Sequence, residues 1–271
     1  MGFSWPSSGS IRRTRRGTRL CVIEESEVLR RIVGILFFTA AIPPSWTVAA
    51  GVPDPAPFDA VLAARARNGG FDYAGTAGQD RKRLAAYLAN LGDAETAAMN
   101  GPEKKAFWIN AYNALAIETL LENPGKSIRD IGGAFNKARH RVGGEMLTLD
   151  DIENRLRETK DARIHFAIVC ASRSCPLLAP RAYAARGLSE ELERQGRAFV
   201  NDPARNVLDR VRGRVALSKI FDWDRKEFER DGGTLLRFVS RYVNDPSTAA
   251  WLAGYSGETV FLEYDWSPNQ P

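Results

Sequence analysis

The side chains best suited to chemistry gather in one short stretch, residues 163–176 (RIHFAIVCASRSCP). This stretch holds His165, one of two histidines, and both Cys170 and Cys175 from a total of three cysteines. Thiols and imidazoles serve as nucleophiles, acid–base groups, metal ligands or disulfide partners. We therefore expect the functional site of this protein to lie in or beside residues 163–176.

The two cysteines admit several chemistries. Cys170 and Cys175 are spaced to form a disulfide that closes a small ring, which contributes about 2 kcal/mol on a chain-entropy model. Two buried thiols, or a reactive nucleophile at Cys175, are the alternatives. A zinc site needs four ligands, and a C-x₄-C pair among scattered acids is not a recognised ligand spacing. We therefore predict neither a metal nor a cofactor.

The apolar run at residues 164–170 predicts a strand that is central and buried on both faces. On such a strand His165 and Cys170 would point to opposite faces and lie about 16 Å apart. A nucleophile and its base must be within hydrogen-bonding distance. The pattern therefore argues against a local cysteine–histidine dyad, although His165 remains a candidate catalytic group with a partner from another element.

Five further side chains are candidates for ligand binding or catalysis. Ser172, Arg173 and Ser174 could surround a bound anion, and Ser174 could also act as a nucleophile, although serines in such loops commonly cap their own backbone. Lys219 follows a predicted hairpin strand and could bind an anionic group. Glu153 could bind a ligand or simply complement the dipole of a helix start.

Two asparagines interrupt the apolar face of a predicted helix at residues 102–122. At 100° per residue, Asn110 and Asn113 fall within the apolar stripe. An unpaired buried amide costs about 1–3 kcal/mol, so each must be hydrogen-bonded. Either they hold irregular loop backbone in place, or one of them lines a ligand pocket.

The remaining pattern predicts a single α+β domain with a helix-rich first half and a small mixed sheet in the second half. Further helices are predicted from apolar periodicity and caps at residues 58–67, 80–91, 94–99, 189–200, 234–243 and 248–253, and from Thr148 or Asp150. Strands are predicted at residues 207–209 and 215–217, which form a hairpin around Arg212-Gly213, and at residues 259–266. Residues 130–146 are expected to be a loop.

The start of the chain predicts export. Residues 28–50 carry a positive region, an apolar run at 32–42 and small residues before Gly51, the expected mature start. The run is shorter than the roughly 20 residues of a membrane span, so an uncleaved anchor is the weaker alternative. Residues 1–27 are predicted to be an upstream extension before a start at Val28, and a twin-arginine route is a further alternative. We expect a bacterial protein that is periplasmic or secreted.

Charge excludes one class of partner. The chain has 38 basic and 33 acidic residues, and residues 1–50 contain seven and three of these. Residues 51–271 therefore keep 31 basic and 30 acidic residues, a net charge of +1. Nucleic-acid binding normally needs a clear excess of basic residues, so we do not expect a nucleic-acid partner.

Several motifs together resemble the domain of unknown function family 547 over roughly residues 70–271. They are AFWINAYNA at residues 106–114, LDDIE at 149–153, the 163–176 stretch, KIFDW at 219–223 and YDW at 264–266. The resemblance implies that Asn110, His165, Cys170 and Cys175 occupy pattern positions of the family. It implies no established activity. The family pattern often carries a histidine where this chain has Asn154. A general base supplied by that histidine would therefore be missing from this chain.

Two functions remain open from the sequence. The first is an exported domain that binds a small molecule, a glycan or an envelope component at the 170–176 loop, with the cysteines as a staple. The second is a hydrolase or acyl transferase that uses Cys175 or Ser174. The sequence favours binding, because it contains no complete catalytic constellation.

Overall fold

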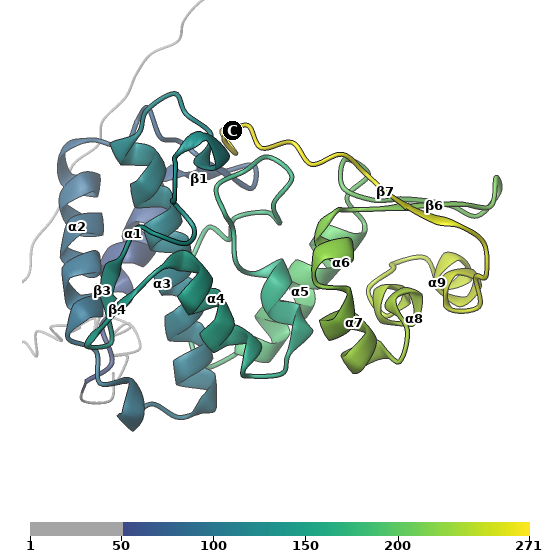
Figure 1. Ribbon diagram of the computed structural model, residues 1–271, viewed down its shortest axis with the longest axis horizontal. Helices are drawn as coiled ribbons and strands as arrows, with labels where there is room; N and C mark the ends of the chain where they lie inside the picture. The colour runs from purple at the N-terminus through teal and green to yellow at the C-terminus, as the bar shows by residue number, and fades with distance from the viewer. Residues whose placement is uncertain (1–50) are drawn as a thin grey trace, which may run out of the picture. The chain divides into compact units, whose positions relative to one another are not determined.

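The computed structural model describes residues 51–271 (Figure 1). The predicted signal peptide and upstream extension lie outside the described residues. Within residues 51–271 the predicted α+β class is confirmed, because this part of the chain combines helices with three small sheets. No helix in this part of the chain is long and apolar enough to cross a membrane.

The first half is mostly helical, as predicted. Its α-helices are α1 (Ala56–Arg65), α2 (Gly78–Gly92), α3 (Gly101–Glu122) and α4 (Leu149–Arg157), with 3-10 turns η1 (Thr96–Ala98) and η2 (Ile128–Asp130). A two-residue pairing of β1 (Ala66–Arg67) with β2 (Gly70–Phe71) follows α1. Capping boxes begin two of the helices: Asn100 with Glu103 at α3, and Thr148 with Asp151 at α4. These reciprocal bonds satisfy backbone N–H groups that a helix start leaves unpaired.

The loop predicted at residues 130–146 is partly wrong. It contains a hairpin of β3 (His140–Val142) and β4 (Glu145–Leu147). The connection is Gly143-Gly144, and both glycines have positive φ, 62° and 82°. A two-residue hairpin turn needs this backbone conformation, which glycine adopts without steric cost. The glycine pair was the sequence signal for a hairpin.

The second half contains the mixed sheet. Its helical elements are η3 (Ala162–Phe166), α5 (Leu188–Val200), α6 (Ile220–Trp223), α7 (Arg225–Gly232), α8 (Leu235–Ser240) and α9 (Pro246–Ala253). Strands β5 (Val207–Asp209) and β6 (Arg214–Leu217) form the predicted hairpin, and β7 (Thr259–Phe261) pairs in parallel with β6. The mixed sheet is therefore confirmed, with β6 at its centre, while α6 and α7 were not predicted.

The strand predicted at residues 164–170 is wrong. Residues 162–166 form η3, and the chain continues without regular structure to Cys170. The side-chain amide of Asn113 donates to the carbonyl of Ala167 at 2.9 Å and accepts from the amide of Val169 at 2.8 Å. A helix side chain thus makes the backbone bonds that a neighbouring strand would otherwise provide. The segment is apolar because it is buried, not because it belongs to a sheet.

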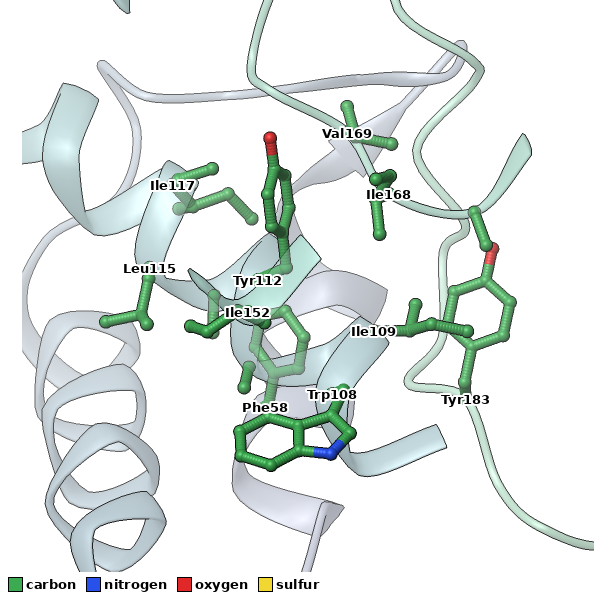
Figure 2. Packing of buried hydrophobic residues seen from close by; sticks show 14 of the residues in the cluster. Phe58, Trp108, Ile109, Tyr112, Leu115, Ile117, Ile152, Ile168, Val169 and Tyr183 are labelled. Atoms are coloured by element: carbon green, nitrogen blue, oxygen red, sulfur yellow. The ribbon is translucent and has the colours of Figure 1, made fainter. Parts of the chain in front are cut away.

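Two apolar clusters surround this segment. Figure 2 shows the first cluster, in which Trp108, Ile109 and Tyr112 of α3 appear with Ile168 and Val169. The second is aromatic and is centred on Phe166, whose ring lies 5.3 to 6.1 Å from the rings of Phe199, Phe221, Phe228, Phe238 and Tyr242. Residues 164–169 thus lie where the two clusters meet.

Replacing Asn113 tests its importance for this arrangement. Asn113→Ala removes both hydrogen bonds and leaves two buried backbone groups unpaired, each costing about 1–3 kcal/mol. We expect the free energy of unfolding, measured by urea denaturation, to fall by about 2–5 kcal/mol. Asn123→Ala at the end of α3 is the matched control, because its amide donates only to a partly buried carbonyl. Equal losses in the two variants would contradict the proposed role of Asn113.

Candidate functional site

A cavity of about 200 Å³ brings together the reactive side chains of residues 163–176 and several distant aromatic residues. We call it the site cavity. Its polar lining residues fall into two groups: Cys170, Cys175 and Tyr264, and Glu153, His165 and Asp224. The remaining wall is formed by Tyr112, Phe135, Ile168, Ile220, Trp223 and Trp266.

A larger cavity, of about 620 Å³, lies elsewhere and is lined by residues that include Lys104, Glu145, Arg155 and Arg163. No cysteine or histidine is among its lining residues, and its charged groups are of both signs. Size alone does not identify a functional cavity, whereas convergent polar groups with perturbed pKa values do. We therefore place the candidate site in the smaller cavity.

The two cysteines are in direct contact as free thiols. Their Sγ atoms lie 2.6 Å apart, and the backbone N–H of Cys170 donates to Cys175 Sγ at 3.0 Å. The hydroxyl of Tyr264 contacts both sulfurs, at 3.3 Å from Cys170 and 3.1 Å from Cys175. The Ser172 hydroxyl lies 3.4 Å from Cys170 Sγ. The sulfurs therefore share one small hydrogen-bonded cluster.

The two thiols differ in acidity. The hydrogen bond with Cys175, helped by those with Ser172 and Tyr264, lowers the pKa of Cys170 to about 7, although burial opposes this shift. Burial, together with the neighbouring Cys170, raises the pKa of Cys175 well above its ordinary value. Cys170 is half-buried, whereas Cys175 is only 2% exposed. Cys170 is thus the more acidic thiol of the pair, and the one more readily ionised near neutral pH.

The loop that carries the cysteines is held by distant backbone. Ala171, between the cysteines, has a φ of 63°, which costs a non-glycine residue roughly 1 kcal/mol. Its carbonyl accepts from the amide of Asn269 at 3.0 Å. The guanidinium of Arg205 donates to the carbonyls of Cys175 at 2.6 Å and Arg173 at 2.9 Å. These contacts stabilise the turn that brings the two sulfurs together.

The second group of polar lining residues is centred on His165, which is enclosed by carboxylates. It is 3% exposed, with Nδ1 3.4 Å from Asp224 Oδ2 and Nε2 3.2 Å from Glu227 Oε2. Arg157 contacts one oxygen of each nearby acid: Glu153 at 2.5 Å, Asp224 at 2.6 Å, and Glu227. A half-buried cation thus offsets part of the charge of three acids.

The acids of this cluster respond differently to their surroundings. Burial raises the pKa of Glu153 above its ordinary value, although the charge of Arg157 opposes the shift. Burial also acts to raise the pKa of Glu227, but its hydrogen bond with His165 and the nearby charges of His165 and Arg157 outweigh it and lower that pKa. Glu153 is therefore more readily protonated than Glu227.

The site contains part of the predicted set of residues. His165, Glu153, Cys170 and Cys175 line the cavity as candidate positions. Ser172 is fully buried beneath Cys170. His165 and Cys170 share the cavity, so the expected separation on opposite faces of a strand is wrong. The structure nevertheless pairs both ring nitrogens of His165 with carboxylates rather than with a thiol.

Other predicted residues lie outside the cavity lining. Asn110 forms a pair of 2.8 Å bonds with the backbone of Tyr183, so both asparagines hold irregular backbone in place. The Ser174 hydroxyl accepts from the amide of Asp265, and Arg173 lies on the surface near the same residue. Lys219 pairs with Asp222 at 2.8 Å.

Sequence reasoning missed Arg157, Asp224, Glu227 and Arg205, and it used Tyr264 only as part of the YDW motif. The YDW and KIFDW motifs pointed to the neighbourhoods of Tyr264 and Asp224 without revealing their roles. Asn154 is exposed, so the position at which the family resemblance implies a histidine faces solvent in this chain.

The fold and site define an α+β domain with a dithiol and a histidine–carboxylate cluster in one cavity. Residues 96–200 match the model of a family described as protein of unknown function, DUF547. This match supports, over residues 96–200, the resemblance found in the motifs. Glu153, His165 and both cysteines lie within the match, whereas Asp224 and Tyr264 lie beyond it. Comparisons with curated proteins and with solved structures gave no match.

The hydroxyl of Tyr264 provides a test of the thiol cluster. In Tyr264→Phe, Cys170 loses one donor that stabilises its thiolate, so its pKa should rise from about 7 towards the ordinary value. We expect the pH midpoint of Cys170 alkylation, followed by mass spectrometry, to move upward, so that the rate at pH 7 falls severalfold. Tyr255→Phe, whose hydroxyl bonds to Gly213 and Glu258 instead, should leave the midpoint unchanged. An unshifted midpoint in Tyr264→Phe would count against the cluster.

Proposed function

We propose that this domain binds a small molecule that contains a disulfide or thiols in the site cavity. The Cys170–Cys175 dithiol then undergoes thiol–disulfide exchange with the bound molecule. One observation carries the proposal: a half-buried thiol of low pKa contacts a buried thiol of high pKa at the cavity wall. A nucleophilic thiol beside a second, resolving thiol is the arrangement that thiol–disulfide exchange requires.

The exchange proceeds in two steps. The thiolate of Cys170 attacks one sulfur of a bound disulfide, which forms a mixed disulfide and releases the other sulfur as a thiolate. Cys175 then loses its proton and attacks Cys170 Sγ, which releases the second half of the substrate as a thiolate. Two protein thiols are oxidised to one disulfide, and one substrate disulfide is reduced to two thiols. The reverse sequence oxidises two substrate thiols.

The positions of the sulfurs suit this exchange. The two sulfurs are in direct contact, as the formation of a disulfide bond between them requires. Tyr264 can donate to whichever sulfur carries the negative charge, because its hydroxyl contacts both. Its own pKa is raised, first by burial and then by the nearby thiols, so it keeps its proton.

Exchange is better supported than hydrolysis or acyl transfer. Those reactions need a base or acid within hydrogen-bonding distance of the nucleophile. His165 bonds to carboxylates, and Ser174 accepts a backbone bond from Asp265. We therefore propose Cys170, rather than Cys175 or Ser174, as the reactive group. Export to the periplasm or beyond belongs to the same proposal, because those compartments permit disulfide chemistry.

Trapping the mixed disulfide tests this function. Reduced protein is mixed with bis(2-hydroxyethyl) disulfide at pH 7 and followed by intact-mass spectrometry. We expect the unaltered chain to lose two hydrogen atoms and to carry no lasting adduct. Cys175→Ala should accumulate one mercaptoethanol adduct on Cys170, because the resolving thiol is missing. Cys170→Ala should react at least about tenfold more slowly, since a thiol of ordinary pKa is only a few per cent ionised at pH 7.

Ser174→Ala is the matched control on the same loop and should behave like the unaltered chain. An adduct that forms equally fast in Cys170→Ala and Cys175→Ala would contradict the assigned roles. A disulfide that forms in air but never exchanges with the probe would identify the cysteines as a structural staple in a binding domain.

A further inference from the structure

We propose that Glu153, His165 and Asp224 bind one divalent transition-metal ion on the wall of the site cavity. Each residue offers one ligand atom, and these three atoms lie within 4.8 Å of one another. All three side chains line the cavity, so a bound ion would keep an open position for a solvent or substrate ligand. This inference does not depend on thiol exchange.

The contact between His165 and Asp224 fits ligands of one ion. Nδ1 and Oδ2 are 3.4 Å apart, and two ligands with bonds of about 2.1 Å to a tetrahedral ion are separated by about this distance. Histidine metal ligands commonly donate their other ring N–H to a carboxylate, which fixes the tautomer. Glu227 is placed for this role, 3.2 Å from Nε2.

This tautomer leaves a lone pair on Nδ1 that faces a carboxylate oxygen. Two acceptors at 3.4 Å repel each other unless a proton or a metal cation lies between them. The arrangement therefore allows two states: His165 is an imidazolium held between Asp224 and Glu227, or neutral His165 shares a metal ion with Asp224. The position of Glu153 as a third ligand on the cavity side favours the metal ion.

Arg157 orients the carboxylates by binding one oxygen of each of the three acids. It contacts Oε1 of Glu153, Oδ1 of Asp224 and Oε1 of Glu227. Glu153 and Asp224 each keep a second oxygen for an ion. Three carboxylates and one guanidinium carry a net charge of −2 when His165 is neutral, and one divalent cation balances it.

The ligand types indicate the class of metal. One imidazole and two carboxylates suit Zn²⁺, Mn²⁺ or Fe²⁺ better than Mg²⁺ or Ca²⁺, which prefer oxygen ligands alone. The expectation of no metal was based on the spacing of the cysteines. Neither cysteine belongs to this set, because the contacts of Cys170 and Cys175 are with each other, Ser172 and Tyr264.

Manganese binding tests the site without interference from the thiols, because Mn²⁺ favours oxygen and nitrogen ligands over thiolates. Metal-free, full-length protein is titrated with Mn²⁺ at pH 7.5, and free Mn²⁺ is measured by electron paramagnetic resonance. We expect one ion per chain. Glu153→Gln and Asp224→Asn should each weaken binding at least tenfold, and Glu227→Gln should weaken it less. Circular dichroism checks that each variant is folded.

Two controls separate this site from other carboxylates and from the dithiol. Asp222→Asn removes a partly exposed carboxylate of α6 that pairs with Lys219, and it should bind Mn²⁺ like the unaltered chain. Cys170→Ala should also bind normally, so failure of thiol exchange and failure of metal binding are distinguishable. Absence of binding at millimolar Mn²⁺, with ¹⁵N resonances showing both ring nitrogens of His165 protonated, would overturn the proposal in favour of the imidazolium.

Discussion

The site depends first on the pairing of the Asn113 amide with the backbone of residues 167–169. This segment joins His165 to Cys170, and it is buried where the two apolar clusters meet. Buried backbone without partners is costly, and no strand within residues 51–271 pairs with this segment. The amide supplies both a donor and an acceptor from the rigid helix α3. Because these two hydrogen bonds satisfy the backbone, the chain can turn within a few residues. The turn places the imidazole of His165 and the thiol of Cys170 around one cavity.

A second constraint is the placement of Arg157. Its guanidinium joins Glu153 of α4 to Asp224, which follows α6, and to Glu227 of α7. Three carboxylates this close would repel one another and draw protons. The guanidinium that contacts all three, with a planar set of donors, opposes this repulsion and fixes the orientation of the carboxylates. The arginine therefore connects the helical first half of the domain to the second half at the cavity wall.

The two groups of polar side chains in the cavity lining use different electrostatic arrangements. Around the thiols, neutral donors surround sulfur, and burial separates the acidities of two otherwise identical groups. In the histidine–carboxylate cluster, formal charges are gathered and partly neutralised by the half-buried guanidinium of Arg157. A molecule in the cavity would meet both a soft nucleophile and a negatively charged, hydrogen-bonding wall. Trp223, which is 50% exposed, and Trp266 form an aromatic border beside them.

The sequence by itself determined most of the local structure: the α+β class, the main helices and the β5–β6 hairpin. Caps, glycine and proline positions and apolar periodicity act over a few residues, so they can be read directly. It also located the reactive stretch at residues 163–176. Tertiary structure decided that this stretch is not a strand, because burial alone makes a segment apolar and only the distant Asn113 shows what pairs with it. The tertiary structure also brings Tyr264, Asp224 and Glu227 to the site. These residues lie about 60 to 90 positions later in the chain than the groups they contact. Their roles arise from where the folded chain places them, and a single sequence contains no local signal for such distant contacts.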